Sequence, residues 1–541
     1  MGAVPFVVIA IAGFAAIVSS AYVVVHVLQL EGYRIERYIR HSWENQSLRN
    51  SFQALIALAT IVSGVVLAVL RIPGAEYVVA IAATAESAAL SWRIWTKPSK
   101  KPLVLTARVY RIILMVAALC CVTVLLGYIP LATVWFATAS AAGLAVTAYA
   151  VAAVIVICMP LIGVLALVVL EPLEIALRRG FINKARARLR EVNPIVIGVA
   201  GSYGKTTTKA ALAAVLGAKY KVLATPESYN TLLGVTRTIN EQLTDDIEVF
   251  IVEMGARHPG DIAVICDLVS PKLGVITRLG PQHLEYFKTP ETIVRAKTEL
   301  ARALPNDGVA IVDADGYSDF AAPLDWTART VRVSARPDSG AQATIDDVRV
   351  NGEGTSFSVV RSDIDSRVEA KTRLLGRHAA FNSALAVVAG LELGVDPIAI
   401  RSGLALLAPV EHRLEIVRND SVVVIDDAFS SNPDGFAAAL EVLASFPGRR
   451  ILITPGMIEL GEQAVPAHVR IATLAAEACD IVILVGRTYP DEFAGTLRDA
   501  GFGETKLFIA SSLAEATEIL GHLLMAGDVV LFENDLPDNF G

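Results

Sequence analysis

The chain is short of cysteine and of positive charge, and each shortage excludes a class of protein. Its 541 residues include only five cysteines, none at a metal-binding spacing, so we expect free thiols in a reducing compartment. The formal net charge of −7 argues against nucleic acid as a main partner. The first apolar run lacks a preceding basic segment and a small-residue cleavage site, so no secretory signal peptide is predicted.

Apolar residues, by contrast, are abundant, and their excess lies before about Leu170. Hydrophobic residues make up 54% of the chain, and the mean hydropathy is +0.53, which is high for a soluble enzyme. After Pro160, the stretch Leu161 to Leu177 is short for a span and is expected to be a kinked extension or an interfacial helix. Five earlier runs are long enough to cross a bilayer: Val4–Leu30, Ser51–Leu70, Ala75–Trp92, Leu103–Ile129 and Leu131–Cys158.

Basic residues alternate between the connections of these runs and predict an orientation. They gather between Arg34 and Arg49, between Arg93 and Lys101, and between Arg178 and Arg190. Basic connections stay in the cytoplasm. We therefore expect a multi-pass protein of the plasma membrane, in contact with lipids, with its N-terminus outside and its catalytic domains in the cytoplasm. Glu86 in the third run is either part of a buried site for a polar head group or a carboxylate that faces the bundle or an interface.

The stretch Gly198 to Lys209, G-V-A-G-S-Y-G-K-T-T-T-K, predicts a phosphate-binding loop. A short apolar run, Pro194 to Ile197, reads as a buried strand before it, and Thr206 to Gly217 reads as a helix after it. Loop N–H groups and a helix N-terminus then face an anion, with Lys205 on the β- and γ-phosphates and the Thr206 hydroxyl on Mg²⁺. Val199 stands where the usual phosphate-loop pattern has its first glycine. ATP is the expected ligand.

Two polar side chains follow later strands of the same predicted domain. Glu253 ends the apolar run from Asp246, and His283 follows the run Leu273 to Thr277. Ligands bind at the carboxyl ends of strands in an open α/β sheet, so a carboxylate and an imidazole there suit a metal close to the phosphates.

These segments together resemble the Mur ligases, ATP-dependent enzymes that form amide bonds in cell-wall synthesis. The resemblance runs from Ile195 to about Val530 and is strongest to the branch that adds D-alanyl-D-alanine to a UDP-muramoyl tripeptide. The phosphate loop has that family's own glycine spacing. The other motifs follow in the family's order: E-M-G-A-R-H-P-G-D-I, G-P-Q-H-L-E-Y-F, A-K-T-E-L, G-R-H-A-A-F-N-S-A-L-A, H-R-L-E, I-D-D-A-F-S-S-N-P and G-M-I-E-L-G-E.

The resemblance implies a role for each matching residue. Lys205, His283 and Lys297 would be catalytic. Thr206 and Glu253 would hold one Mg²⁺, and His283 and Lys297 a second, the lysine as a carbamate. The nucleotide would be bound by Gly201, Ser202, Tyr203, Gly204, Lys205, Thr206, Thr207, Asn382, Arg413 and Asp427. The substrates would be contacted by Asn230, Asn432 and Glu459.

The expected architecture is an α-helical transmembrane bundle followed by two α/β domains. Residues 1–177 form the transmembrane region and 178–192 a basic linker. Residues 193–408 form the ATP-binding central domain, in which Asp307 to Leu375 read as a small β insertion. Residues 409–541 form a Rossmann-like domain with parallel strands at 422–425, 451–454, 481–485 and 529–532.

The expected reaction is amide-bond formation, in which ATP phosphorylates an acceptor carboxylate and an amine then attacks the acyl-phosphate. The sequence leaves the identity of the substrates open. The transmembrane region takes the place of the family's soluble UDP-sugar domain, and the family's acceptor-facing residues are altered at Phe429, Ser430 and Glu533. The acceptor is a muramoyl peptide or a lipid-linked carboxylate, and the amine is D-Ala-D-Ala or a related amino acid or peptide. The alternatives are a ligase for another cell-envelope polymer or lipid conjugate, and a non-catalytic membrane scaffold for cell-wall synthesis proteins.

Overall fold

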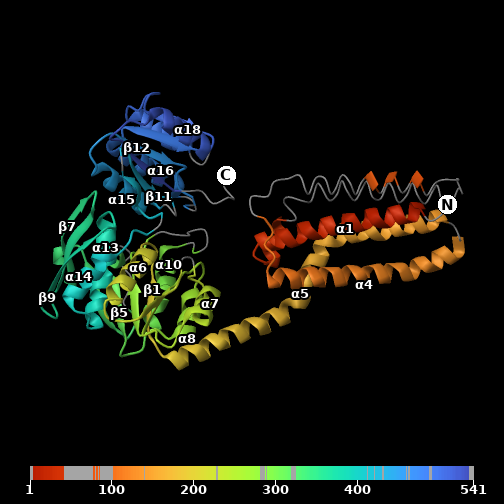
Figure 1. The fold of residues 1–541 in the computed structure, drawn as a ribbon, viewed down its shortest axis with the longest axis horizontal. Coiled ribbons are helices and arrows are strands. Elements are labelled where there is room, and N and C mark those ends of the chain that lie inside the picture. Colours follow the sequence, from red (N-terminus) through yellow and green to blue (C-terminus); the bar gives the residue numbers. More distant parts are fainter. Residues whose placement is uncertain are drawn as a thin grey trace. The chain divides into compact units, whose positions relative to one another are not determined.

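The computed structural model divides the chain into two compact units, Met1–Arg179 and Gly180–Gly541. Each unit is described by itself (Figure 1). The structure describes residues 4–41, 77–78, 81–82, 84–85, 102–138, 141–226, 229–280, 287, 289–318, 325–410, 412–419, 421–428, 432–458, 460, 463–486 and 490–534.

The first unit contains long apolar helices that pack on one another. They are α1 (Val4–Leu30), α4 (Ala107–Thr138) and the first part of α5 (Ala141–Val192). Their shared core includes Leu28 of α1, which is fully buried. Close approach of α5 to α1 requires glycine at position 163, since a Cβ there would lie 2.5 Å from Val24 Cγ1.

Three described helices are long and apolar enough to cross a membrane, by length and composition only: Val7–Leu30, Ala107–Leu126 and Ala150–Val192. The predicted span Ser51–Leu70, and all but six residues of Ala75–Trp92, lie outside the described residues. The fourth and fifth predicted spans were divided at Pro130, but α4 runs through this proline to Thr138.

The first domain of the second unit is built on a nine-stranded sheet in the order β2-β3-β1-β4-β5-β6-β7-β8-β9. The strands from β2 to β7 are parallel to their neighbours, whereas β7, β8 and β9 pair antiparallel. The predicted β insertion is therefore not a separate sheet in this fold, because its strands extend the central one. The strands are β1 (Ile195–Ala200), β2 (Val222–Ala224), β3 (Val249–Glu253), β4 (Leu273–Ile276), β5 (Val309–Asp313), β6 (Arg329–Ser334), β7 (Ala343–Asn351), β8 (Gly354–Arg361) and β9 (Ser366–Thr372).

Helices cover both faces of this sheet because the side chains of its strands alternate in direction. In β1, Ile197 and Val199 belong to one core, and Val196 and Ala200 belong to the core on the other face. The first core contains α6 (Lys205–Leu216), α13 (Arg377–Glu392) and α14 (Pro397–Leu406). The second contains α7 (Leu232–Gln242), α8 (Asp261–Val269), α10 (Pro290–Lys297) and α11 (Glu299–Arg302). Short α12 (Ala314–Ser318) and the 3₁₀ turn η1 (Pro337–Ser339) connect strands.

The end of α5 belongs to the second of these cores. Residues 178–192, expected as a basic linker, are helical, and they carry the buried side chains of Ala185 and Leu189. Arg188 Nε donates to the Leu243 carbonyl oxygen at 2.9 Å. This part of the helix is therefore packed against the first domain of the second unit.

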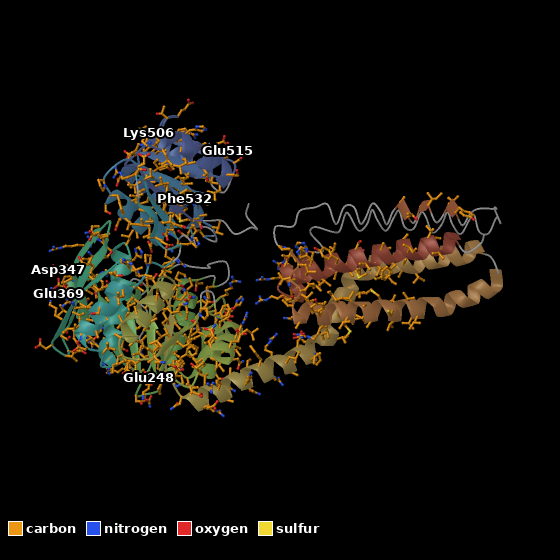
Figure 2. The ribbon with its side chains drawn as sticks, in the orientation of Figure 1. Glu248, Asp347, Glu369, Lys506, Glu515 and Phe532 are labelled. Carbon is orange, nitrogen blue, oxygen red and sulfur yellow. The ribbon has the colours of Figure 1, made fainter. Side chains whose placement is uncertain are left out.

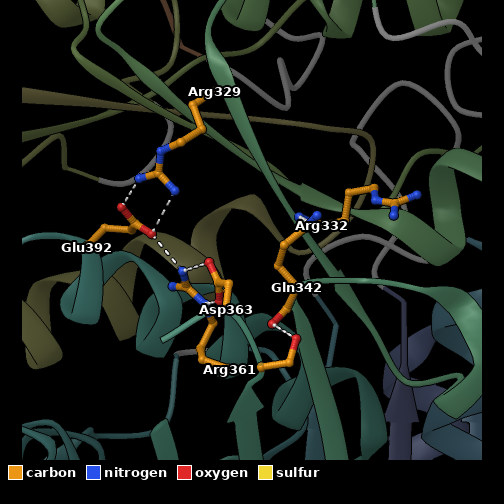
Figure 3. Close-up of polar contacts among 7 residues, drawn as sticks. Arg329, Arg332, Gln342, Arg361, Asp363 and Glu392 are labelled. Carbon is orange, nitrogen blue, oxygen red and sulfur yellow. Dashed lines mark hydrogen bonds and ion pairs between the residues drawn. The ribbon is translucent and has the colours of Figure 1, made fainter. Parts of the chain in front are cut away.

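A buried ion-pair network fixes the β7–β9 extension to α13 (Figure 3). Arg361, at the end of β8, is 1% exposed. Its Nη2 lies 2.7 Å from Asp363 Oδ2 and 2.9 Å from Glu392 Oε1, and Arg329 of β6 also pairs with Glu392. The exposed face of the extension carries charged side chains, among them Asp347 and Glu369 (Figure 2).

The second domain of this unit has a six-stranded sheet in the order β10-β11-β15-β12-β13-β14, parallel except for β10. The four strands predicted from the sequence are β11, β12, β13 and β15, and β10 and β14 were missed. The strands are β10 (Glu415–Asn419), β11 (Val423–Asp427), β12 (Arg450–Thr454), β13 (Ile481–Val485), β14 (Leu507–Ala510) and β15 (Val529–Glu533). The helices are α15 (Pro433–Ala444), α16 (Ala464–Ala478), α17 (Pro490–Asp499) and α18 (Leu513–Leu523).

Candidate active site

The loop between β1 and α6 has the shape of a phosphate cradle. Gly204 caps α6 with a φ of 78°, and a Cβ there would lie 2.3 Å from Asn382 Oδ1. A Cβ on Gly201 would lie 2.0 Å from Thr277 Oγ1. Both glycines are therefore required by sterics as well as by conformation. The predicted loop residues, including Thr207 at the first turn of α6, are thus brought together at a helix N-terminus, where N–H groups lack intrahelical partners.

Part of this loop is already held by the neighbouring strand end. The N–H groups of Ser202 and Tyr203 donate to the Arg278 carbonyl oxygen at 2.9 and 3.1 Å. The Ser202 hydroxyl donates to the Gly280 carbonyl oxygen at 3.0 Å. These two N–H groups therefore fix the loop, and a bound phosphate would accept hydrogen bonds from the N–H groups at the start of α6.

The Lys205 ammonium lies within the curve of the loop. Its Nζ donates to the carbonyl oxygens of Gly201 and Ser202 at 3.0 and 2.9 Å. Burial lowers the pKa of Lys205 to about 8, while the Glu253 carboxylate opposes this effect. Within the described residues, the hydrogen bonds of this half-buried cation go to carbonyl oxygens, and a phosphate, which brings opposite charge, would bind it more strongly.

Glu253, at the end of β3, is the buried carboxylate of the site. It is 4% exposed. Its Oε2 lies 3.1 Å from Thr206 Oγ1 and 3.0 Å from Lys209 Nζ, and its Oε1 accepts from Asn230 Nδ2 at 3.3 Å. Burial raises the pKa of Glu253, but the charges of Lys209 and Lys205 outweigh burial, so the pKa is lowered overall and the group is ionised.

These oxygens fit one divalent cation. The Thr206 hydroxyl and the Glu253 carboxylate are adjacent, and hard oxygen ligands next to a phosphate cradle are what Mg²⁺ prefers. Among the residues that the structure describes, there is no cluster of three or more His, Cys, Asp or Glu side chains that could hold a metal. The described part of the site thus supplies two protein ligands, and phosphate and water would complete the shell.

Lys297, the last residue of α10, is also buried near this site, at 1% exposure. Its Nζ donates to the Ala256 carbonyl oxygen at 3.2 Å and lies 5.7 Å from the centre of the Phe287 ring. Burial lowers the pKa of Lys297 to about 7, helped by the charge of Lys205. An appreciable fraction of this amine is therefore neutral at physiological pH.

A cavity of about 370 Å³ opens beside the phosphate loop. Its volume is within the range of small-molecule sites. Polar side chains predicted for the nucleotide and substrates lie on its wall, namely Asn382, Arg413, Asp427 and Asn432. Its apolar lining comes from Ile345, Val348, Leu374, Leu375 and Phe381. Such a cavity suits a nucleoside whose phosphates lie on the loop.

Two predicted residues take structural roles as well. Asn432 caps α15, since its Oδ1 accepts from the Gly435 N–H at 2.9 Å. The Asn230 carbonyl oxygen accepts from the Gly255 N–H at 2.8 Å, which fixes the segment next to Glu253. His283 and Glu459 lie outside the described residues.

Sequence reasoning missed Lys209, Asp313 and His378. Lys209 follows Lys205 by four residues, so helical spacing alone places both on one face of α6 and was a usable signal. Asp313 ends β5 at the sheet edge where ligands bind, and it lines the cavity. His378 lines the same cavity, and burial lowers its pKa to about 4.

Comparison with known proteins identifies both domains. The Mur ligase middle domain matches residues 199–390, and the Mur ligase glutamate ligase domain matches residues 412–533. A UDP-N-acetylmuramoyl-tripeptide–D-alanyl-D-alanine ligase from Mycobacterium tuberculosis is 32% identical over 358 residues, which is 62% of this chain and 69% of that protein. The Escherichia coli protein of the same name is 31% identical over 60% of this chain and 74% of that protein.

Solved structures agree with these matches. The crystal structure of MurF ligase from Thermotoga maritima in complex with ADP has a TM-score of 0.57 and 26% identity. It covers 66% of this chain and 80% of that chain. The two α/β domains of the second unit thus have the fold of this ligase.

The predicted location of the protein is corrected by the same relatives. A multi-pass position in the plasma membrane was expected from the apolar runs, but the relatives that share the ligase domains are soluble enzymes of the cytoplasm. The prediction is therefore wrong. Its physical error was to read hydropathy, which reports that a helix tolerates lipid, as evidence that lipid surrounds it.

Both ligase domains are matched in order, and a relative 32% identical is covered over more than two thirds of its length. The described phosphate loop, Glu253 and Lys297 lie together in the first of these domains. The chain belongs to the Mur ligase family of ATP-dependent, amide-bond-forming enzymes.

Proposed function

We propose that the protein joins D-alanyl-D-alanine to a UDP-N-acetylmuramoyl tripeptide in peptidoglycan synthesis, with hydrolysis of ATP to ADP and phosphate. The observation that carries the proposal is the group formed by Lys205, Thr206 and the buried Glu253 carboxylate beside a glycine cradle. The substrates are those in the names of the relatives at 31–32% identity.

In the proposed reaction, the acceptor carboxylate attacks the γ-phosphorus of ATP, ADP leaves, and the amine of the dipeptide then displaces phosphate from the acyl-phosphate. Phosphoryl transfer depends mainly on positioning and charge stabilisation. Lys205 would exchange its two carbonyl contacts for phosphoryl oxygens, and the first N–H groups of α6 would hold the same oxygens. Asn230 restrains Glu253 through a hydrogen bond to Oε1 and remains a proposed contact of the acceptor.

Thr206 and Glu253 would hold Mg²⁺, which neutralises charge on the phosphates. We place a second ion near Lys297, whose carbamate would supply an oxygen ligand that the free amine cannot. The support is the burial of this lysine and the neutral fraction of its amine, since the neutral form adds CO₂. His283 remains a proposed ligand of this ion.

Tyr203, Gly204, Asn382, Arg413 and Asp427 remain the proposed contacts of the nucleoside. Their common position on one cavity supports this assignment. Asn432 and Glu459 remain proposed contacts of the acceptor or the amine.

A lipid-linked acceptor is the second candidate. It is favoured by one observation, the apolar helical unit that lies outside both matched domains. The scaffold alternative is disfavoured, because the phosphate loop, Glu253 and Lys297 are all in place.

The test is ligation by the purified full-length protein with ATP and Mg²⁺. Phosphate release and product mass are measured with UDP-N-acetylmuramoyl tripeptide and D-Ala-D-Ala, and in parallel with lipid-linked tripeptide and with other amines. A product of added D-Ala-D-Ala, formed at one phosphate per bond, is expected. ATP binding without ligation of any acceptor would contradict the proposal.

A further inference from the structure

Two carboxyl groups meet at the carboxyl edge of the C-terminal sheet. β11 and β15 are parallel neighbours, and their last paired residues are Asp427 and Glu533. Phe532, the residue before Glu533, is labelled in Figure 2. Paired residues of adjacent strands project to the same face about 4.8 Å apart. The two side chains are joined by a hydrogen bond.

A hydrogen bond between two carboxyl groups requires a proton, and the surroundings decide which group carries it. Ionised carboxylates only accept hydrogen bonds. Asp427 Oδ1 accepts from the Leu414 N–H at 3.1 Å, and the Arg413 cation acts on the same group, so Asp427 has the environment of an anion. Glu533 is 0% exposed. A second negative charge beside Asp427 is disfavoured because Glu533 has no contact with solvent, so Glu533 holds the proton.

Only one member of this pair reaches the nucleotide cavity. Asp427 lines the cavity, whereas Glu533 lies behind it on β15. We propose that Glu533 is a positioning residue for nucleotide binding: as a neutral acid it donates to Asp427 and holds that carboxylate toward the ligand. The inference rests on the proposed function, in which this cavity binds ATP.

The titratable and charged groups that act on Asp427 come from three parts of the domain. They are Glu533 on β15, Arg413 before β10 and Asp426 on β11, which itself pairs with His412 at 2.7 Å. Burial raises the pKa of Asp427 to about 6, although the hydrogen bond from Glu533 and the charge of Arg413 act to lower it. Loss of the Glu533 donor therefore raises the pKa of Asp427 further, so this carboxylate becomes protonated at a higher pH.

The experiment measures ADP affinity of the full-length protein by titration calorimetry between pH 5 and pH 8. Glu533→Gln keeps a donor in the same place and is expected to bind ADP as the wild type does. Glu533→Leu removes the donor, so affinity is expected to fall about tenfold at pH 7. Its loss of affinity on acidification is expected to begin at a higher pH than in the wild type.

Asp528→Asn is the matched control. Asp528 is also buried, pairs with Arg449 at 2.7 Å and immediately precedes β15 at the end away from Glu533, so its substitution perturbs β15 without reaching Asp427. Its ADP affinity and acid profile are expected to match the wild type. A second readout is the infrared C=O band of a protonated carboxylic acid at pH 7, expected in the wild type and absent from Glu533→Gln.

The outcomes separate this inference from the proposed function. Wild-type affinity and acid profile in Glu533→Leu would overturn the positioning role, as would equal losses in the Gln and Leu variants. Absence of the acid band would overturn the protonated state of Glu533 even if the Leu variant had unfolded. Failure of the wild type to bind ADP at all would instead overturn the use of ATP.

Discussion

At the scale of single residues, Lys205 is the group on which turnover depends most directly. Lys205→Met keeps the length and apolar stem of the side chain, so the fold is expected to persist while ATP turnover falls about 10²-fold or more. The control is Lys219→Met, which removes a cation just beyond the same helix, where its Nζ contacts the Leu393 and Gly394 carbonyl oxygens. Phosphate release and circular dichroism are the measurements. Near-normal turnover in Lys205→Met would contradict the assigned phosphate site.

Lys297 allows a test of the carbamate that does not depend on activity alone. We expect ¹³C-labelled CO₂ to give a carbamate signal in the wild type that is lost in Lys297→Ala. Turnover of that variant is expected to recover in part with small carboxylates such as acetate, because they return an oxygen ligand. Labelling that persists in Lys297→Ala would place the carbamate on another lysine.

The buried carboxyl group of Asp313 is expected to make the free energy of unfolding depend on pH. Burial raises its pKa to about 6, against the lowering effect of the Gly316 N–H, which donates to Oδ1 at 2.9 Å. The folded state therefore keeps a proton that the unfolded chain loses above about pH 4, so the free energy of unfolding falls as pH rises through about 6.

Asp313→Asn removes this buried charge and keeps the acceptor oxygen. The variant is expected to gain about 1–3 kcal/mol over the wild type at pH 7 and nothing near pH 4. Thermal melts at both pH values measure the difference. Asp307→Asn, an exposed partner of Lys272, is the control and is expected to change little. An equal gain for Asp313→Asn at both pH values would show that ionisation is not the cause.

The individual residues of the site were predictable where a motif fixes both chemistry and backbone. Lys205, Thr206 and Glu253 meet as the phosphate-loop pattern and the strand end required. Lys209 was missed because a lysine on a helix is ordinarily solvated, and its burial is set by packing that sequence alone does not show. The contact between Asp427 and Glu533 could not be predicted because it depends on strand order, in which β15 lies between β11 and β12.

At the scale of elements, Arg361 joins β8 to α13 and, through Glu392, to β6. Arg361→Met leaves the largely buried Glu392 without one of its two cations, so we expect a loss of about 3 kcal/mol in the free energy of unfolding. Arg367→Met is the matched control on the neighbouring strand β9. Its partner Asp347 is exposed, so its loss is expected to stay within about 0.5 kcal/mol.

Chemical denaturation of both variants measures these values. Equal, small losses would mean that the network adds no net stability, because the desolvation of Arg361 then offsets its ion pairs. A loss of unfolding free energy in Arg361→Met but not in Arg367→Met would show that Arg361 attaches the β7–β9 extension to the rest of the domain.

Parallel strands buried on both faces were predictable because they appear as continuous apolar runs. β3 and β13 are of this kind and were found. β10 was missed because Glu415-Ile-Val-Arg-Asn is an edge strand with little apolar signal. The stretch Asp307 to Leu375 was predicted to be β structure, and it contains β5 to β9. Its membership of the central sheet was not predicted, and β6 and β7 pair at only two residues of β6, Val333 and Ser334.

At the scale of the whole molecule, the boundary between the two units decides where the chain can be divided. The contact boundary lies between Arg179 and Gly180, within α5. Beyond it, Ala185 and Leu189 are buried in the core formed with α7 and α8. Asn240 Nδ2 also donates to the Phe181 carbonyl oxygen at 3.0 Å. Residues 180–192 thus stabilise the ligase domains.

We expect a protein that begins at Gly180 to keep the stability of the ligase domains, whereas one that begins at Glu191 loses about 3–5 kcal/mol through the exposure of this core. Leu189→Ala in the longer fragment is the matched intermediate. Under the proposed function, the Gly180 fragment also ligates D-Ala-D-Ala to the UDP-linked tripeptide as fast as the full-length chain. If that fragment binds ADP normally but ligates only when the first unit and a lipid-linked acceptor are both present, the second candidate acceptor replaces the first. Because the fragment retains the whole described phosphate site, such a loss would not be explained by damage to ATP binding, and the first unit would then contribute to acceptor binding.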